Sequence, residues 1–340
     1  MRVLFHVTMP PSPMAACDAV IQEIEAIRAG VPGDICHLYP AHRPGTRFPR
    51  RLWGLQHLPQ IKREERHIDL HHVFNPDPYA FEVLRTLRRP ILYTAVAGVR
   101  GAHQNAALRL AGRVHTLVVP AATDLERLRA WRIDNAVVVK PGIDTSRFSY
   151  APVPKGTSPT LLMGSAPWTE EQFRTKGVDV LLELARQRHD LHLIFLWRGV
   201  LEDQMRRRVA AASLQDRVEV LTEQVDVNRV LARVHASVVL AADDTLVKSY
   251  PHSLLESLAA GKPVLVSRLI PFADEVEQSR CGVVVGELNL TGVARAVDRL
   301  FANYEGYCAV ALQTGQSAFN QQHMVAAYEK LYHAVVRISA

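Results

Sequence analysis

Backbone amides and a carboxylate that together could hold a charged ligand lie in one short stretch, KSYPHSLLESLAAGKPVLVS (248–267). The pattern predicts a helix over 252–260, because Gly261 suits the position after a helix end and Pro263 prevents its continuation. The first amides of a helix have no partner inside it and carry a partial positive charge. The stretch therefore predicts an anion site at the helix start.

The first turn of this helix comprises His252, Ser253 and Leu254, whose free N–H groups suit a diphosphate. Glu256 lies about one turn further on, where a carboxylate can accept two hydroxyl hydrogen bonds, as proteins often do to hold a ribose. The alternative is that Glu256 is a solvated charge that favours the helix dipole. The residues alone leave both interpretations open.

The elements that must position this helix alternate regularly along the chain. Short runs that are apolar nearly throughout predict strands covered on both faces. In the first half these runs are 3–7, 34–39, 69–74, 90–94, 116–119 and 136–140, and in the second half 160–164, 191–196, 217–221, 236–240, 263–267 and 282–285. Helical patterns lie between them, at about 15–29, 78–88, 102–112 and 122–131, then 177–189, 201–213, 226–234, 252–260, 271–279, 291–304 and 318–338.

This repetition predicts an α/β protein with two Rossmann-like, doubly wound parallel-sheet domains. The 340 residues are enough for two domains of ordinary size. A segment rich in proline interrupts the alternation of strands and helices and predicts a linker over 151–158. The linker separates a first domain over 1–150 from a second domain over 159–317, which a last helix over 318–340 follows. Ligands of such sheets bind beyond the carboxyl ends of the strands and in the cleft between domains.

Composition and motifs bear on the cellular compartment and the class of protein. The four cysteines form no Cys-x-x-Cys pair, which disfavours a structural zinc site and a disulfide framework and favours a reducing, cytoplasmic compartment. We find no evident signal peptide and no apolar run near the ~18 residues that span a bilayer. A Gly-x-Gly-x-x-Gly fingerprint is also absent, which disfavours a dehydrogenase.

The excess of positive charge lies in the first half, which has 20 basic and 13 acidic residues among the first 150. Seven of these basic residues lie in 43–66, interleaved with Phe48 and Trp53. One hypothesis is a peripheral contact with anionic lipid at the inner membrane face. The alternative, which we favour, is a basic surface loop whose aromatic residues fill the core. No recognised nucleic-acid motif accompanies the charge, so a nucleic-acid partner is not expected.

The stretch 248–267 resembles the donor-binding helix of retaining GT-B glycosyltransferases that carry a Glu-x7-Glu motif. The resemblance extends to TKGVDVLLELA (175–185), which is similar to the helix start where a lysine of that family contacts the donor diphosphate. VVVKPGID (137–144) and FNQQHMVAAYEKLYHAVV (319–336) resemble the end of its first domain and its last helix, which crosses back onto that domain.

The resemblance implies roles for particular residues. Lys176 corresponds to the diphosphate lysine, although the residue alone is better explained as a surface lysine beside a helix start. Glu256 corresponds to the glutamate that holds the donor ribose. Ser253 and Leu254 correspond to the positions whose amides meet the phosphate, with His252 beside them. In the same comparison the first domain receives the acceptor.

The chain also departs from that pattern. Lys248 stands eight positions before Glu256, where the family has the glutamate that touches the donor sugar. Ser165 or Ala166 stands where the family has an arginine beside its lysine, and the candidate substitutes are Arg174 and Arg198. Many members carry a histidine after the strand at 90–94, where this chain has Val96 and Ala97, and His103 lies further along.

The resemblance implies a nucleotide-sugar-dependent transferase of the hexosyltransferase kind, with a glycan, lipid-linked or small-molecule acceptor and a place in polysaccharide biosynthesis. We expect no cofactor, since the nucleotide sugar is a substrate. We also expect no metal, because Asp243 and Asp244 are adjacent and form no Asp-x-Asp motif. No catalytic nucleophile or base is identified. The alternatives are a catalytically silent protein of this fold that binds a nucleotide sugar or a partner, and a sugar-nucleotide epimerase.

Overall fold

The structure, a computed structural model, describes residues 1–10, 18–40, 48–150, 152–156, 158–197, 200–244 and 247–339. The chain divides into two compact units. Unit 1 comprises Met1–Gly142 and Gln321–Ala340, and unit 2 comprises Ile143–Asn320. The segment 151–158, which the sequence pattern suggests as a linker, therefore falls inside the range of unit 2.

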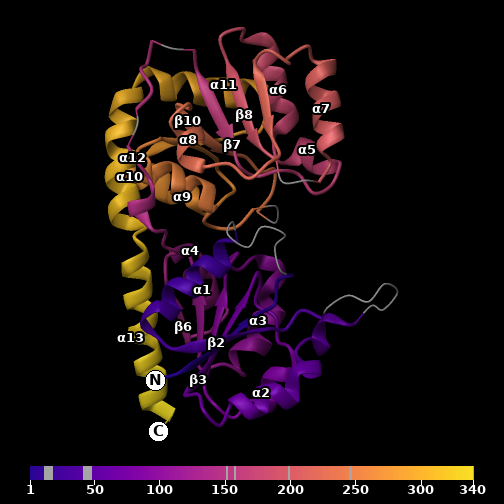
Figure 1. Cartoon of the computed structure of the whole chain (residues 1–340), viewed down its shortest axis with the longest axis vertical. Helices are drawn as coiled ribbons and strands as arrows, with labels where there is room; N and C mark the ends of the chain where they lie inside the picture. The colour runs from indigo at the N-terminus through magenta and orange to yellow at the C-terminus, as the bar shows by residue number, and fades with distance from the viewer. Residues whose placement is uncertain are drawn as a thin grey trace. The chain divides into compact units, whose positions relative to one another are not determined.

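Unit 1 is built on a six-stranded sheet in the order β2-β1-β3-β4-β5-β6, with every neighbouring pair parallel (Figure 1). Strands such as β1 and β5 are almost wholly apolar, as strands covered on both faces must be, whereas the edge strand β2 carries Asp34 and His37. The strands are β1 (Val3–Val7), β2 (Gly33–His37), β3 (Leu70–Asn75), β4 (Ile91–Ala95), β5 (Thr116–Val119) and β6 (Ala136–Val138).

The α-helices that the structure describes in unit 1 are α1 (Ala19–Gly30), α2 (Leu58–Glu64), α3 (Gln104–Ala111), α4 (Ala122–Ala130) and α13 (Gln321–Ser339). The helix predicted over 78–88 is wrong as an α-helix, since only a short 3-10 turn forms at Glu82–Thr86. The amide of Tyr79 bonds instead to the hydroxyl of Tyr93 on β4, at 3.1 Å, which fixes the backbone outside a helix. Phe81 is buried in the core below it.

Helix α13 completes unit 1 from the far end of the sequence. It packs on α1 (Figure 1) through one apolar face made of Met324, Tyr328, Tyr332 and Val335, all buried. The hydroxyl of Tyr332 lies 2.7 Å from Nδ1 of His72 on β3, and the hydroxyl of Tyr328 lies 3.2 Å from Oγ1 of Thr94 on β4. The helix is thus joined to two adjacent strands by buried hydrogen bonds as well as by apolar contact.

Unit 2 holds a second six-stranded parallel sheet, in the order β12-β11-β10-β7-β8-β9. Its strands are β7 (Thr160–Met163), β8 (His192–Leu196), β9 (Val218–Leu221), β10 (Ala236–Val239), β11 (Val264–Ser267) and β12 (Gly282–Val285). The order reverses between β10 and β7, which is the topological switch point where such sheets bind ligands. The predicted α/β class with two doubly wound parallel sheets is confirmed.

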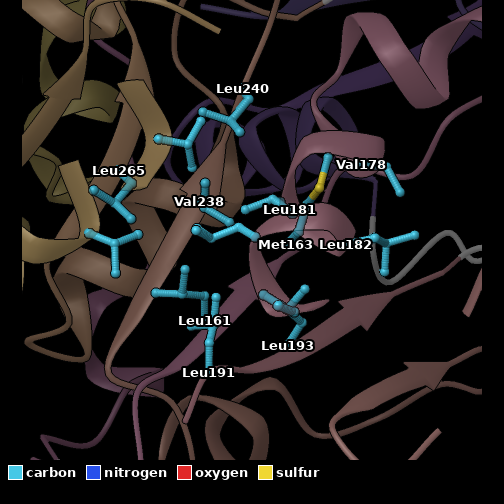
Figure 2. Packing of buried hydrophobic residues seen from close by; sticks show 14 of the residues in the cluster. Leu161, Met163, Val178, Leu181, Leu182, Leu191, Leu193, Val238, Leu240 and Leu265 are labelled. Carbon is cyan, nitrogen blue, oxygen red and sulfur yellow. The ribbon is translucent and has the colours of Figure 1, made fainter. Parts of the chain in front are cut away.

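The α-helices described in unit 2 are α5 (Glu171–Thr175), α6 (Val178–Gln187), α7 (Glu202–Ala211), α8 (Val227–Leu231), α9 (His252–Ala259), α10 (Phe272–Ser279), α11 (Leu290–Ala302) and α12 (Tyr304–Ala318). Figure 2 shows the main core, in which Leu181 of α6 packs against Met163 of β7 and Val238 of β10. This core holds together the strands whose carboxyl ends carry the candidate site.

Helix α12 is not predicted from the sequence, because its two glycines and several small residues weaken the helical pattern. The structure gives the reason for one of them. A Cβ atom at Gly315 would lie 2.3 Å from the carbonyl carbon of Leu258 and 2.4 Å from the amide of Ala259 on α9. Glycine is therefore needed for the close approach of two helices, although it weakens a helix in isolation.

Lys262 provides a stability test because its side chain is fully buried between α9 and β11. Burial lowers its pKa to about 8, so the folded chain binds this proton less tightly than the unfolded chain does. Stability should therefore rise as pH increases from about 8 towards ~10.4, by about 3 kcal/mol in total. Lys262→Met should lack this rise. The measurement is denaturant unfolding from pH 7 to 10, with the exposed Lys155→Met as control, and equal pH slopes for wild type and Lys262→Met would contradict it.

Candidate functional site

The turn that presents Lys176 is fixed by the glycine after it. Gly177 has a φ of 75°, in the left-handed region, and a Cβ atom there would lie 2.7 Å from Cδ1 of Leu240 at the end of β10. The carbonyl of Thr175 accepts a 2.7 Å hydrogen bond from the amide of Ala242 in the loop after β10. Lys176 is thus tied to the carboxyl end of the sheet, at the switch point.

The side chain of Lys176 is buried, with 4% of its surface exposed. Its Nζ donates to the carbonyl of Ala166 at 3.2 Å and to Oγ of Ser165 at 3.4 Å, in the loop after β7. Among the described residues it forms no ion pair with a carboxylate. Burial accordingly lowers its pKa below the ordinary lysine value. An ammonium group held this way is a cation without a counter-ion, and an anionic ligand would supply one.

The same loop meets the start of α9. A Cβ atom at Gly164 would lie 3.0 Å from Cβ of Ser253, so the backbone after β7 passes directly against the first turn of that helix. Ser165 is the next residue in the loop after β7, and Lys176, which follows α5, donates a hydrogen bond to its hydroxyl. The structure therefore brings Lys176, Ser165 and Ser253 into one neighbourhood, although they are far apart in the sequence.

Helix α9 begins at His252 and ends at Ala259, close to the predicted range 252–260. Pro251 precedes it without a side-chain cap, so no side chain at that position occupies the amides of the first turn. His252 and Ser253 are half-buried, whereas the Leu254 side chain is fully buried. The Leu254 amide already donates a 3.0 Å hydrogen bond to the carbonyl of Pro251, so the amides of His252 and Ser253 are the ones that a ligand could use. Glu256 is half-buried in the following turn.

The remaining predicted residues of unit 2 stand as follows. Lys248 is half-buried in the segment before α9, whose next residue, Ser249, accepts a 3.1 Å hydrogen bond at its carbonyl from the amide of Phe272. Arg198 lies outside the described residues. Arg174 is largely exposed and pairs with Glu171 at 3.5 Å. Both candidates for the position where an arginine is expected, Ser165 and Ala166, accept a hydrogen bond from Lys176.

Trp168 is an addition that the sequence analysis did not make. Its side chain is 65% exposed, and it lies two residues beyond the Ala166 carbonyl that Lys176 binds. Its amide donates to Oε1 of Gln172 at 2.8 Å, which ties the loop to α5. An exposed indole at this place is available to stack on a planar ligand group. A tryptophan within a loop segment was the only signal in the sequence.

In unit 1 the segment after β4 is held by backbone bonds. The amides of Val96 and Ala97 donate to the carbonyls of Asn75 and Pro76, both at 2.9 Å. His103 lies further along, where its Nδ1 accepts a 3.2 Å hydrogen bond from the amide of Arg100. The structure thus gives His103 a local capping role.

The basic segment 43–66 is described from Phe48 onward, so Arg43 and Arg47 lie outside the described residues. The guanidinium of Arg50 pairs with Asp77 and lies 4.4 Å from the ring centroid of Tyr79. Lys62 pairs with Glu65 at 2.6 Å. Trp53 packs against the core of the unit, as the core-filling alternative predicts, while Phe48 is 39% exposed.

The described residues offer neither a metal-binding cluster nor a membrane-spanning helix. In the part of the chain that the structure describes, no group of three or more His, Cys, Asp or Glu residues could hold a metal ion. None of the helices described is both long and apolar enough to cross a bilayer.

Part of the chain matches a known protein family. Residues 171–313, which contain Lys176 and α9, match the family model of the glycosyl transferases group 1. A search of the curated proteins found no match.

Three solved structures share the fold over nearly the whole chain. Sucrose-phosphate synthase from Thermosynechococcus elongatus is 16% identical, with a TM-score of 0.77 over 99% of this chain and 100% of that one. A glycosyltransferase from Rickettsia africae is 14% identical, with a TM-score of 0.74 over 98% of both. Anabaena HepE in complex with UDP-glucose is also 14% identical, with a TM-score of 0.73 over 98% of this chain and 100% of that one.

These structures have the GT-B architecture, which confirms the predicted fold. The family match adds the class of chemistry, because it covers the segment that carries the candidate site. The match of residues 171–313 to this family makes the chain an enzyme of the glycosyltransferase class.

Proposed function

We propose that the chain transfers a sugar, with retention, from a nucleotide-sugar donor to a glycan, lipid-linked or small-molecule acceptor, without a metal. The observation that carries this proposal is the buried ammonium of Lys176, which lacks a carboxylate partner among the described residues and lies in the loop system that touches α9. A diphosphate is the ligand that best matches a cation beside the opening amides of a helix.

The same groups suit the reaction. When the bond to the sugar breaks through an oxocarbenium-like state, negative charge grows on the departing diphosphate. The Lys176 ammonium and the α9 amides would stabilise that charge more strongly than the charge of the ground state. Glu256, half-buried one turn into α9, would accept the ribose hydroxyls.

The proposed donor is suggested by HepE, a structural neighbour that was solved in complex with UDP-glucose. We therefore propose UDP-sugars first, with cytoplasmic action and peripheral contact with the inner membrane face if the acceptor is lipid-linked. Lys248, in place of a glutamate, favours a second candidate function, a silent protein that binds the donor without transfer.

A donor panel separates these functions. Thermal shift with UDP-, GDP-, ADP- and dTDP-sugars identifies the ligand, and product analysis with and without acceptor then follows turnover. Transfer that keeps the anomeric configuration supports the proposal. Binding without turnover supports the silent protein, and conversion of the donor without acceptor supports an epimerase.

Addition of a chelator should leave the initial rate of transfer unchanged. The reason is that the Lys176 ammonium and the α9 amides occupy the role that a divalent cation plays on a diphosphate in metal-dependent enzymes. The measurement is nucleoside diphosphate release with EDTA, and with magnesium restored as control. A rate that falls with EDTA and returns with magnesium would contradict it.

A further inference from the structure

Strand β12 leaves one edge of the unit 2 sheet unpaired. It is the last strand in the sheet order and pairs only with β11, through the register from Val264↔Gly282 to Ser267↔Val285. Its outer backbone groups therefore have no strand beside them. The edge lies on the side of the sheet remote from the switch point between β10 and β7, so it belongs to a different surface from the candidate donor site.

A groove runs along this free edge. One depression of about 630 Å³ is lined by Gly282, Val283 and Val284 together with residues of α10, α11 and α12. A second, of about 380 Å³, is lined by Val283, Val284 and Gly286 together with residues of α11. The two depressions share Val283, Val284 and Arg299, so they form one groove over the length of the strand, which we call the β12 groove.

The β12 edge lacks the charged residues that the β9 and β2 edges carry. Edge strands usually carry a charge, a proline or a bulge that prevents pairing with another chain. The opposite edge, β9, carries Glu219, which pairs with Arg233. The β2 edge carries Asp34, paired with Arg2 at 2.6 Å. By contrast β12 reads Gly-Val-Val-Val, a sequence that favours strand pairing.

The walls of the β12 groove are positively charged. Arg280, Arg295 and Arg299 line it, and each is exposed and forms no ion pair or side-chain hydrogen bond with another described residue. Glu277 is also present in the lining, but Arg268 pairs with it. Glu287, which accepts a 2.8 Å hydrogen bond from Asn289, is the remaining acidic residue of the described lining.

We propose that the β12 groove binds an extended acidic segment of a partner protein, which adds to β12 as a seventh strand. The free edge supplies backbone hydrogen bonds, and the three arginines select carboxylates by charge. A second copy of this chain is a poorer occupant, because a symmetric pair would place the same arginines opposite one another. The partner would thus dock without covering the donor site, and the proposal does not depend on the proposed function.

A short peptide tests this directly. The probe is a labelled hexapeptide that alternates glutamate and valine, and its binding to the full chain is followed by fluorescence anisotropy at low and high salt. We expect saturable binding that weakens with salt. The same peptide with N-methyl groups on alternate amides should bind at least ~10-fold more weakly, because it cannot form the strand ladder, and a lysine–valine peptide should not bind.

The protein variant is Arg280→Glu combined with Arg299→Glu, which should weaken binding of the acidic peptide by at least ~10-fold. Arg207→Glu, an exposed change on α7, is the matched control and should bind as wild type does. Melting temperature and donor thermal shift verify that the variants fold. No peptide binding, equal binding by the double variant, equal binding of the N-methylated peptide, or a dimer in sedimentation that the double variant abolishes would each overturn the proposal.

Discussion

Lys176→Ala should weaken binding of the nucleoside diphosphate by about 10- to 140-fold, which corresponds to ~1.5–3 kcal/mol for a lost hydrogen bond to a charged group. The variant removes the ammonium that the loop after β7 holds beside α9. Glu256→Ala should weaken binding by a similar amount if its carboxylate holds the ribose. The measurement is titration calorimetry with the nucleoside diphosphate that the donor panel identifies.

The control for Lys176→Ala is Arg174→Ala, which removes an exposed cation two residues away that already pairs with Glu171. Its affinity should match that of wild type. The pH dependence adds a second readout. Because burial lowers the pKa of Lys176, wild-type affinity should fall as pH rises, beginning below the range of an ordinary lysine, and Lys176→Ala should lack that fall. Unchanged affinity in both Lys176→Ala and Glu256→Ala would refute the assignment of the site.

The second large effect is on stability, at Glu65 in unit 1. Its side chain is 6% exposed and accepts hydrogen bonds from Lys62 at 2.6 Å, from His71 at 3.1 Å and from the amides of Arg88 and Arg89. Glu65→Ala would leave these buried donors without their acceptor, so we expect a loss of ~3–5 kcal/mol in the free energy of unfolding. Denaturant unfolding followed by circular dichroism measures it.

Acid unfolding gives an independent check on Glu65. Burial alone would raise its pKa, but the hydrogen bonds from Lys62, Arg88 and His71 outweigh it and lower the pKa to about 2. The stabilisation is therefore complete above the ordinary glutamate pKa of ~4.3 and is lost as pH falls towards 2. Glu65→Ala should show a smaller loss over that window than wild type. Glu64→Ala, the neighbouring half-buried carboxylate, should keep the wild-type profile, and a Glu65→Ala profile parallel to wild type would contradict the prediction.

The strands could be predicted because their signal is local. A strand covered on both faces must be apolar along its length, so runs such as 3–7 and 116–119 give β1 and β5 with the same bounds that the structure has. The alternation of strands and helices then indicates the class of fold. No long-range information is needed for either step.

The elements that escaped prediction depend on contacts between distant residues. Gly315 weakens the helical pattern of α12, yet it is required where that helix meets Leu258 of α9. In the segment 78–88 the hydroxyl of Tyr93 captures the amide of Tyr79 and prevents a helix. A local sequence pattern shows neither the contact of Gly315 with α9 nor the hydrogen bond from Tyr79 to Tyr93.

The candidate site divides in the same way. Lys176 and the start of α9 were accessible from sequence, because a Lys-Gly turn and a helix between a proline and a glycine are local patterns. The contact between Gly164 and Ser253, and the hydrogen bond from Lys176 to Ser165, join residues that only the folded sheet brings together. In the sequence Ser165 marks only the absence of an expected arginine, whereas in the structure its hydroxyl accepts a hydrogen bond from Lys176.

Unit 2 is continuous in sequence, whereas unit 1 needs α13, which is encoded after all of unit 2. On a ribosome the second Rossmann-like domain can therefore finish folding while the first still exposes the surface that Tyr328 and Tyr332 will cover. The unit that begins synthesis first is therefore the one that matures last. A premature stop before the codons for residues 321–340 would spare unit 2 and leave unit 1 open to aggregation and proteolysis.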